Sequence, residues 1–245
     1  MNKDRTVIVT GAAGGIGREV VRRFLDNGDT VIATDTGDEA LGKLADEFGS
    51  ERLHTRAADI ASEEDCLRLA DLARETTGRV DVLVNVAGFF PVQPFLEMSA
   101  DDWRKIIDIN LTGTALMCRA VLPLMTGRGW GRIVNVGSAS VNEGVPGQAH
   151  YVSAKAGVVG LTRSLAREFG GEGITVNLVA PGVTITPAAA KALPREVQDA
   201  QIERRAIKRE ERPEDLTGAV FFFASPASDF VTGQTLVVDG GLHMA

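Results

Sequence analysis

The sequence predicts an α/β fold in which one doubly wound parallel sheet of seven strands carries helices on both faces. Two observations lead to this prediction. Short apolar runs rich in β-branched residues alternate with segments whose apolar residues recur at helical spacing. The sequence also contains no repeat, low-complexity tract or linker-like stretch, so residues 1–245 are expected to form a single domain. Strands that alternate with helices in this way pair in parallel through right-handed crossovers.

Seven segments have the length and composition of strands. The third is the weakest, and the fourth is apolar nearly throughout, which is typical of a strand buried on both faces. The expected strands are Thr6–Thr10, Thr30–Thr34, Arg52–Ala57, Val80–Val84, Arg132–Val136, Ile174–Val179 and Thr235–Asp239.

The helices between these strands are marked by their ends as well as by their periodicity. Two of them begin at a Ser that is followed three positions later by Asp, the spacing of an N-terminal cap. The expected helices are one ending at Gly28, one beginning at Ser62, one beginning at Ser99, Val152–Phe169 and Pro213–Ala224. The least regular stretch, 184–212, is predicted to be a helical lid over the substrate and not a second domain.

The charge balance excludes some classes of partner. Acidic residues outnumber basic ones by 33 to 26, which gives a formal net charge of −7 and argues against nucleic acid or an anionic membrane. No run reaches the roughly 18 apolar residues of a membrane-spanning helix. The first apolar run is cut at Gly11, too early for a secretion signal. We therefore expect a soluble, cytoplasmic protein.

Cysteine and histidine usage predicts no metal site. Two cysteines, Cys66 and Cys118, cannot form a disulfide framework or a four-thiolate zinc site, and both lie in apolar helical stretches, so inert core thiols are expected. The three histidines, His54, His150 and His243, lack the spacing of metal ligands.

A glycine-rich turn follows the first strand. Residues 10–17 read Thr-Gly-Ala-Ala-Gly-Gly-Ile-Gly and open a helix. Glycines let the backbone approach a pyrophosphate closely, and the helix behind them points its free N–H groups at the anion. A plain tight turn would also use glycine, but the strand-turn-helix context favours a dinucleotide site.

Asp35, at the end of the second strand, indicates which dinucleotide binds. A carboxylate there accepts hydrogen bonds from a ribose diol and repels a 2′-phosphate. Gly14 and Thr36 supply no cation that would offset this repulsion. The sequence therefore favours NAD (NADH) over NADP, although Asp35 could also be a solvated residue at a strand end.

Proton-transfer chemistry is indicated by Tyr151, the only tyrosine, and Lys155 four residues later. On a helix these side chains share a face, and a nearby ammonium lowers the pKa of a phenol from about 10. Such a pair is common on protein surfaces, but Ser138, just past the fifth strand, lies on the same sheet edge as the glycine turn. Asn110 lies on an apolar helix stripe, where it is either functional or a structural amide bonded to a neighbouring backbone.

Taken together, these motifs resemble those of the classical short-chain dehydrogenases/reductases. They occur in order over essentially the whole chain: Thr10–Gly17, Asn-x-Ala-Gly at Asn85–Gly88, Ser138, Tyr151–Lys155, Pro181–Gly182 and Val238–Gly241. The resemblance implies a Rossmann fold, a nicotinamide-dependent oxidoreductase and a homotetramer. Two positions depart from the family pattern: Val86 replaces its second Asn, and Thr184 stands where an aliphatic residue is usual.

The resemblance also implies a role for each motif residue. Tyr151 would be the general base in alcohol oxidation and the general acid in reduction, with its pKa lowered by Lys155. Ser138 would hydrogen-bond the substrate oxygen, and Asn110 would hold a water in the proton relay. The implied cofactor contacts, besides Asp35, Tyr151 and Lys155, are Gly11, Gly15, Ile16, Gly17, Asp59, Ile60, Asn85, Ala87, Gly88, Pro181, Gly182, Thr184 and Thr186.

The residues around these motifs predict the substrate only by their character. A largely apolar lining without a cationic clamp fits a neutral secondary alcohol or ketone, and an aromatic or cyclic one is expected. The expected lining residues are Ser138, Phe89, Phe90, Ser140 and Gln148. The two phenylalanines could instead be loop packing.

Two other functions share some of these features. A 3-oxoacyl-type reductase is possible in chemistry, but a carrier-protein partner favours a basic surface and Asp35 disfavours NADPH. A nucleotide-binding sensor that has lost its activity would be expected to lose the tetrad. Asn110, Ser138, Tyr151 and Lys155 are all present, which argues against a sensor.

Overall fold

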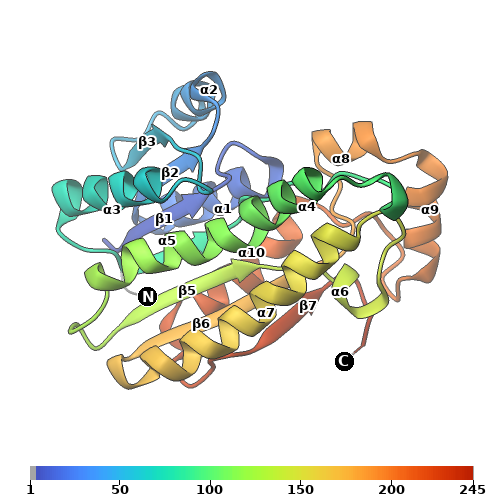
Figure 1. The fold of residues 1–245 in the computed structure, drawn as a ribbon. Coiled ribbons are helices and arrows are strands. Elements are labelled where there is room, and N and C mark those ends of the chain that lie inside the picture. The colour runs from blue at the N-terminus through green and yellow to red at the C-terminus, as the bar shows by residue number, and fades with distance from the viewer. Residues whose placement is uncertain (1–3, 245) are drawn as a thin grey trace.

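The computed structural model describes residues 4–244 and contains one seven-stranded sheet (Figure 1). Every neighbouring pair of strands is parallel, and the order across the sheet is β3-β2-β1-β4-β5-β6-β7. The strands are β1 Thr6–Thr10, β2 Thr30–Asp35, β3 Leu53–Ala57, β4 Val82–Asn85, β5 Gly131–Val136, β6 Ile174–Pro181 and β7 Thr235–Val238. The predicted doubly wound sheet is confirmed.

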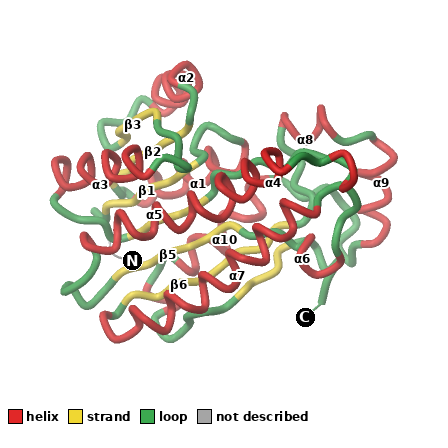
Figure 2. Tube along the Cα trace, in the orientation of Figure 1, coloured by secondary structure: helices red, strands yellow, loops and turns green. Residues whose placement is uncertain are grey.

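Helices cover both faces of this sheet, as Figure 2 shows. α3, α5 and α7 pack on one face, and α1, α2 and α10 pack on the other. The helices are α1 Gly15–Asn27, α2 Asp38–Phe48, α3 Glu63–Thr77, α4 Ala100–Ile107, α5 Gly113–Val121, α6 Ser140–Glu143, α7 Ala149–Phe169, α8 Pro187–Ala192, α9 Arg195–Arg204 and α10 Pro213–Phe223.

The strand sequences divide their side chains between two separate cores. In β1, Val7 and Val9 belong to the core beneath α1 and α10, while Ile8 belongs to the core beneath α3 and α5. Successive residues of a strand point to opposite faces of a sheet, so a strand that is apolar throughout serves both cores. This explains why the central strands lack the polar alternation of a one-sided sheet.

Several element boundaries differ from those expected. The helix that begins after Ser99 is interrupted by a π-helical turn at Asp108–Thr112, which separates α4 from α5. Helix α7 begins at Ala149, three residues earlier than predicted, so Tyr151 lies in its first turn. Helix α2 was not anticipated, although Leu41 and Leu44 provide its buried face.

Both predicted Ser caps are confirmed. Ser62 accepts a hydrogen bond from the backbone of Asp65, and Ser99 forms a reciprocal capping box with Asp102. One helical run, Ala100–Leu124, is long and apolar enough by length and composition to cross a membrane. Half of its most apolar window is buried, and α5 packs on α3 while α4 packs on α7, so this run is a core helix of the fold.

The sheet topology places the site at one edge. Strand β1 pairs with both β2 and β4, so the chain reverses its direction of growth between β1 and β4. In open parallel sheets, ligands bind beyond the carboxyl ends of the strands at this switch point. Helices α6, α8 and α9 lie together beyond those ends, at the right of Figure 1. Segment 184–212 contains α8 and α9, and its role as a lid over the substrate stays a prediction.

Candidate active site

Two glycines of the turn after β1 cannot be replaced by a larger residue unless the backbone moves. Gly11 has a φ of 63°, and a Cβ there would lie 2.7 Å from the Cα of Ala87. A Cβ on Gly17 would lie 2.1 Å from the carbonyl oxygen of Gly11. Helix α1 begins at Gly15 with no side-chain cap, which leaves its first backbone N–H groups for a ligand. This cradle fits the pyrophosphate of a dinucleotide.

The carboxylate of Asp35 is held beside this cradle by backbone donors. Its Oδ2 accepts a hydrogen bond from the amide of Ala13 at 3.1 Å, and its Oδ1 accepts one from the amide of Thr36 at 2.8 Å. The turn also bonds to β2 directly, because the amide of Ala12 donates to the carbonyl of Thr34. A fixed carboxylate at this place fits the ribose diol of a dinucleotide.

Other predicted cofactor residues lie around the same edge, but their side chains have different partners. Asn85 is buried and donates from Nδ2 to the side chain of Asn135, so contact of Asn85 with a nucleotide would come from its main chain. Ile60 is buried against Gly113 of α5. Asp59 follows β3 and accepts a hydrogen bond from the amide of Ala61.

The segment after β6 lies against the glycine turn. A Cβ on Gly15 would lie 2.6 Å from Cγ2 of Thr186, so these two segments are in close contact. The Thr186 hydroxyl caps α8, and the Thr184 hydroxyl donates to Glu211 at 2.7 Å. Pro181, Gly182, Thr184 and Thr186 all line the same cavity as Ile16.

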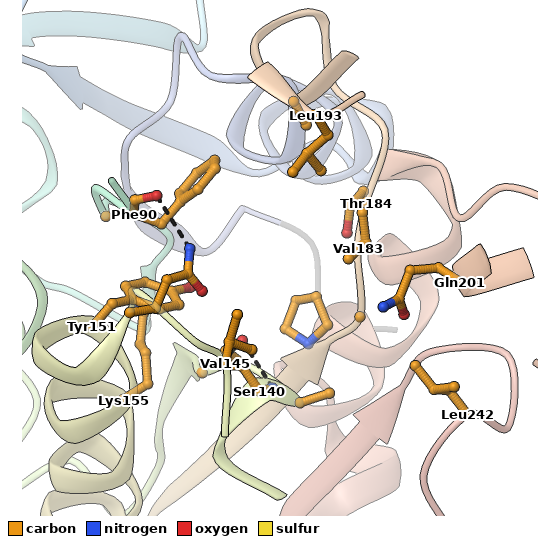
Figure 3. Close-up of a pocket in the computed structure, with 18 of the residues that line it drawn as sticks. Phe90, Ser140, Val145, Tyr151, Lys155, Val183, Thr184, Leu193, Gln201 and Leu242 are labelled. Atoms are coloured by element: carbon orange, nitrogen blue, oxygen red, sulfur yellow. Dashed lines mark hydrogen bonds between the residues drawn. The ribbon is translucent and has the colours of Figure 1, made fainter. Parts of the chain in front are cut away.

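The structure brings Ser138, Tyr151 and Lys155 together at this cavity (Figure 3). The Ser138 hydroxyl hydrogen-bonds the Tyr151 phenol. Lys155, one turn further along α7, donates from Nζ to the carbonyl of Val136 at 2.8 Å, and its Nζ lies 5.8 Å from the centre of the Tyr151 ring. The three side chains therefore converge on the edge that also carries the glycine turn.

Burial sets the protonation of this cluster. The pKa of Tyr151 is raised by burial, and the hydrogen bond from Ser138 only partly opposes this. Burial also lowers the pKa of Lys155 to about 8. Desolvation of the phenolate therefore outweighs any lowering of the Tyr151 pKa by Lys155, and the role of Lys155 in lowering that pKa stays a prediction. A phenol that is protonated at neutral pH is suited to donate a proton to a carbonyl oxygen.

Asn110 lies in the π-helical turn and is fully buried. Its side chain bonds to the main chain of Phe89 in both directions, with Oδ1 accepting at 3.2 Å and Nδ2 donating at 2.9 Å. A Cβ on Gly88 would lie 2.8 Å from Asn110 Oδ1 and 3.5 Å from Lys155 Nζ, so the amide is near the catalytic cluster. The side chain thus holds the loop after β4, and the predicted role of Asn110 in holding a water stays a prediction.

A cavity of about 300 Å³ opens in front of Tyr151. Four predicted substrate residues line it, namely Phe90, Ser138, Ser140 and Gln148. Phe89 does not, because its ring is half exposed and lies 5.8 Å from Nζ of Lys105, outside the cavity. Sequence reasoning missed three polar lining residues, Glu143, Gln201 and His243, which come from separate parts of the chain.

The cysteines take no part in this site. Both are buried, and burial raises the pKa of Cys66 to about 11 and that of Cys118 to about 12, so neither is a thiolate at neutral pH. Among residues 4–244, no group of three His, Cys, Asp or Glu side chains is arranged to hold a metal ion.

Known proteins resemble this chain in both sequence and fold. A family model described as enoyl-(acyl carrier protein) reductase matches residues 11–243. The chain is 38% identical over 240 residues to the 3-oxoacyl-(acyl-carrier-protein) reductase of Vibrio harveyi, covering 98% of each chain. It is 34% identical over 238 residues to the meso-2,3-butanediol dehydrogenase of Serratia marcescens, covering 97% of this chain and 94% of that one.

Solved structures agree with this. A Brucella melitensis protein described as a short-chain dehydrogenase/reductase, glucose/ribitol dehydrogenase, superimposes with a TM-score of 0.95 at 37% identity and covers 99% of this chain and 98% of its own. An actinorhodin polyketide ketoreductase solved with NADPH superimposes with a TM-score of 0.92 at 35% identity, covering 98% and 97%.

The parallel sheet, the dinucleotide cradle and the buried phenol define a Rossmann-fold oxidoreductase that uses a nicotinamide cofactor and acts on secondary alcohols or ketones. More narrowly, the chain belongs to the short-chain dehydrogenase/reductase family.

Proposed function

We propose that the protein is an NAD(H)-dependent oxidoreductase that interconverts a neutral secondary alcohol and its ketone. The observation that carries this proposal is the convergence of Ser138, Tyr151 and Lys155 on a cavity whose other wall is formed by Ile16 of the glycine turn and Thr186. A carbonyl in that cavity is within reach of a proton donor and faces the dinucleotide cradle.

Each side chain of the cluster has a defined task in this reaction. The bound nicotinamide supplies or accepts the hydride. In reduction the Tyr151 phenol donates its proton to the carbonyl oxygen, while the Ser138 hydroxyl hydrogen-bonds the same oxygen and orients it. Lys155, with a pKa of about 8, is mostly protonated at neutral pH and favours the phenolate that forms. In alcohol oxidation the same steps run in reverse.

Asp35 supports NAD over NADP. Its two oxygens are fixed by the amides of Ala13 and Thr36, so the negative charge cannot swing away from an incoming 2′-phosphate. Positions 14 and 36, which flank this carboxylate in the turn and after β2, carry Gly and Thr and no cation. The ketoreductase with the similar fold was solved with NADPH, so the cofactor is a point on which this chain is proposed to differ from it.

The names of several relatives favour a second candidate, a 3-oxoacyl thioester reductase. The chemistry at Tyr151 would be the same, and the difference would lie in the partner that presents the ketone. A net charge of −7 does not favour docking of an acidic carrier. We therefore rank this candidate second.

We also propose that the protein is a cytoplasmic homotetramer in which segment 184–212 acts as the substrate lid. Of the apolar run in α10, Phe221 and Phe223 are buried, whereas Phe222 is 39% exposed and Phe230 beyond it is fully exposed. Exposed aromatic rings of this kind are suited to subunit contact. Sedimentation analysis of the purified chain checks this assembly.

A panel of secondary alcohols and ketones, each assayed with NAD(H) and with NADP(H), tests the proposal. The formation or loss of reduced nicotinamide is followed by absorbance. We expect turnover of neutral substrates, with kcat/KM for NAD at least about tenfold above that for NADP. A preference for NADP, or turnover of 3-oxoacyl thioesters alone, would contradict the proposed function.

A further inference from the structure

The far end of the cavity carries a group of polar side chains that the reaction at Tyr151 does not use. Glu143 is the last residue of α6, Gln201 belongs to α9, and His243 follows β7. We call these three residues the distal wall. In Figure 3 the amide of Gln201 is turned toward the interior of the cavity, on the side away from Tyr151.

A line of polar atoms runs from the catalytic serine toward this wall. The hydroxyls of Ser138 and Ser140 are 2.8 Å apart. Ser140 and Glu143 occupy the first and last positions of the single-turn helix α6, and both line the cavity. Residues three apart on a helix are neighbours, with their Cβ atoms about 5–6 Å from each other. The wall therefore lies roughly one helical turn beyond Ser140, whose hydroxyl is itself 2.8 Å from that of Ser138.

The Glu143 carboxylate is anionic, and only one of its two oxygens has a polar partner among the described residues. Its Oε2 accepts a hydrogen bond from Arg204 at 2.7 Å, and this guanidinium holds the pKa of the carboxyl below its ordinary value. The same oxygen lies 3.4 Å from Nε2 of His243. No hydrogen bond to Oε1 is recorded from any residue in 4–244.

The carboxylate of Asp239 orients the ring of His243. Its Nδ1 lies 2.8 Å from Oδ2 of Asp239, which is 2% exposed and also accepts hydrogen bonds from the amides of Gly241, Leu242 and His243. This turn aims the other ring nitrogen, Nε2, toward Glu143. Nε2 is buried and makes no aligned hydrogen bond with a described residue. A buried polar atom without a partner costs free energy unless a ligand or water satisfies it.

The charges at the wall select among possible ligands. Glu143 and Asp239 contribute two negative charges and Arg204 one positive charge, so an anionic group is disfavoured. The other carboxylate oxygen, Oε1, is instead matched by a hydroxyl, which can donate a hydrogen bond to it, while Nε2 of His243 faces Oε2 at 3.4 Å.

We propose that the distal wall binds a second hydroxyl of the substrate, so that the preferred substrate is a hydroxyketone or the corresponding diol. The hydroxyl of such a substrate stands at least about five bonds from the reacting carbon, because that span covers only about one turn of helix. This rests on the proposed function, because Tyr151 must act on the carbonyl at the other end. It replaces the expectation of an aromatic or cyclic substrate.

The test compares two ketones of equal length, 6-hydroxyhexan-2-one and heptan-2-one, in which a methyl group replaces the hydroxyl. The parent, Glu143→Gln and His243→Leu are assayed with NADH, and Val145→Ala serves as a control that changes an apolar lining residue. We expect the parent to favour the hydroxyketone by about tenfold or more in kcat/KM. Glu143→Gln should reduce this ratio by about fivefold or more, since a neutral amide oxygen replaces the charged acceptor, whereas Val145→Ala should affect both ketones alike.

The outcomes separate this inference from the proposed function. If the parent reduces both ketones equally well, or if Glu143→Gln leaves the ratio unchanged, the distal wall does not read a hydroxyl, although the oxidoreductase stands. If Glu143 only ties α6 to the segment after β7, the melting temperature and both values of kcat/KM should fall together at a constant ratio. Absence of turnover with every ketone and both cofactors would overturn the proposed function itself.

Discussion

The two ends of the cavity are built in different ways. At the nucleotide end, Gly11 follows β1 directly, Gly17 lies in the first turn of α1 and Asp35 is the last residue of β2, and their contacts are mostly with main-chain atoms. At the substrate end, Glu143, Gln201 and His243 come from three segments far apart in the sequence. Glu143 contacts Arg204 and His243 through side chains. Cofactor binding is therefore specified by local backbone shape, whereas substrate choice is specified by tertiary convergence.

A large effect is expected at Lys155, which lies between the two ends. Lys155→Met should lower turnover by about 10²-fold or more, because the ammonium that favours the phenolate is removed. Steady-state kinetics measures the loss. Turnover within a few-fold of the parent would show that the cluster works without the amine.

The same variant tests the burial of this charge through its pH dependence. Burial lowers the pKa of Lys155 from 10.5 to about 8, so between these values the unfolded chain binds more protons than the folded one. The stability of the parent should therefore rise with pH across this window relative to that of Lys155→Met. Denaturant unfolding at several pH values measures the difference, and a constant difference would contradict the buried ammonium.

Gly17→Ala should break the nucleotide end selectively. Its new methyl group would lie 2.1 Å from the carbonyl oxygen of Gly11, so the turn must shift, and NADH affinity should fall by about tenfold or more. Gly42→Ala in α2, where a Cβ would meet nothing within 4 Å, is the matched control and should bind NADH normally. Fluorescence titration distinguishes the two, and equal affinities would mean that the turn does not hold the cofactor.

Cofactor choice should follow the charge beside β2. Asp35→Ala combined with Thr36→Arg removes a fixed carboxylate and adds a cation, so preference should move toward NADP by about 10- to 100-fold. The ratio of kcat/KM for NADP to that for NAD, in the parent and in the double variant, is the measurement. A parent that already prefers NADP would show that Asp35 does not exclude the 2′-phosphate.

The smallest effect is expected from a comparison of Phe89 and Phe90, two adjacent residues at the substrate end. Phe90 lines the cavity and its ring centre lies 6.1 Å from that of Tyr151, whereas Phe89 lies outside. Phe90→Ala should raise KM for the substrate by about tenfold, and Phe89→Ala by no more than about twofold. Equal changes in KM would mean that the loop closes differently around the substrate.

The sequence predicts the nucleotide end well because its signals are local. A strand, a glycine turn and a helix follow one another, and the caps at Ser62 and Ser99 depend on neighbours three residues away. Helix α2 was missed because its apolar face is short, with Leu41 and Leu44 as its buried residues. No residue pattern in the sequence predicts the π-helical turn at Asp108–Thr112.

The substrate end was predicted less completely for physical reasons. Glu143 and His243 are a hundred residues apart in the chain, and only folding brings Nε2 of His243 to 3.4 Å from Oε2 of Glu143. The direction of the pKa shift at Tyr151 likewise depends on how deeply the phenol is buried, which residue spacing does not report. Phe89 and Phe90 have the same side chain, and only the path of the loop places one of them in the cavity.

Replacement of Tyr151 by Phe tests the substrate end of the cavity while the nucleotide end stays unchanged. The variant removes a single hydroxyl, the one that is bonded to Ser138, and leaves the glycine turn and Asp35 untouched. We predict that turnover falls by about 10²–10⁴-fold or more while the dissociation constant for NADH stays close to that of the parent. Near-normal turnover in this variant would remove the phenol from the reaction, and with it the mechanism derived from this site.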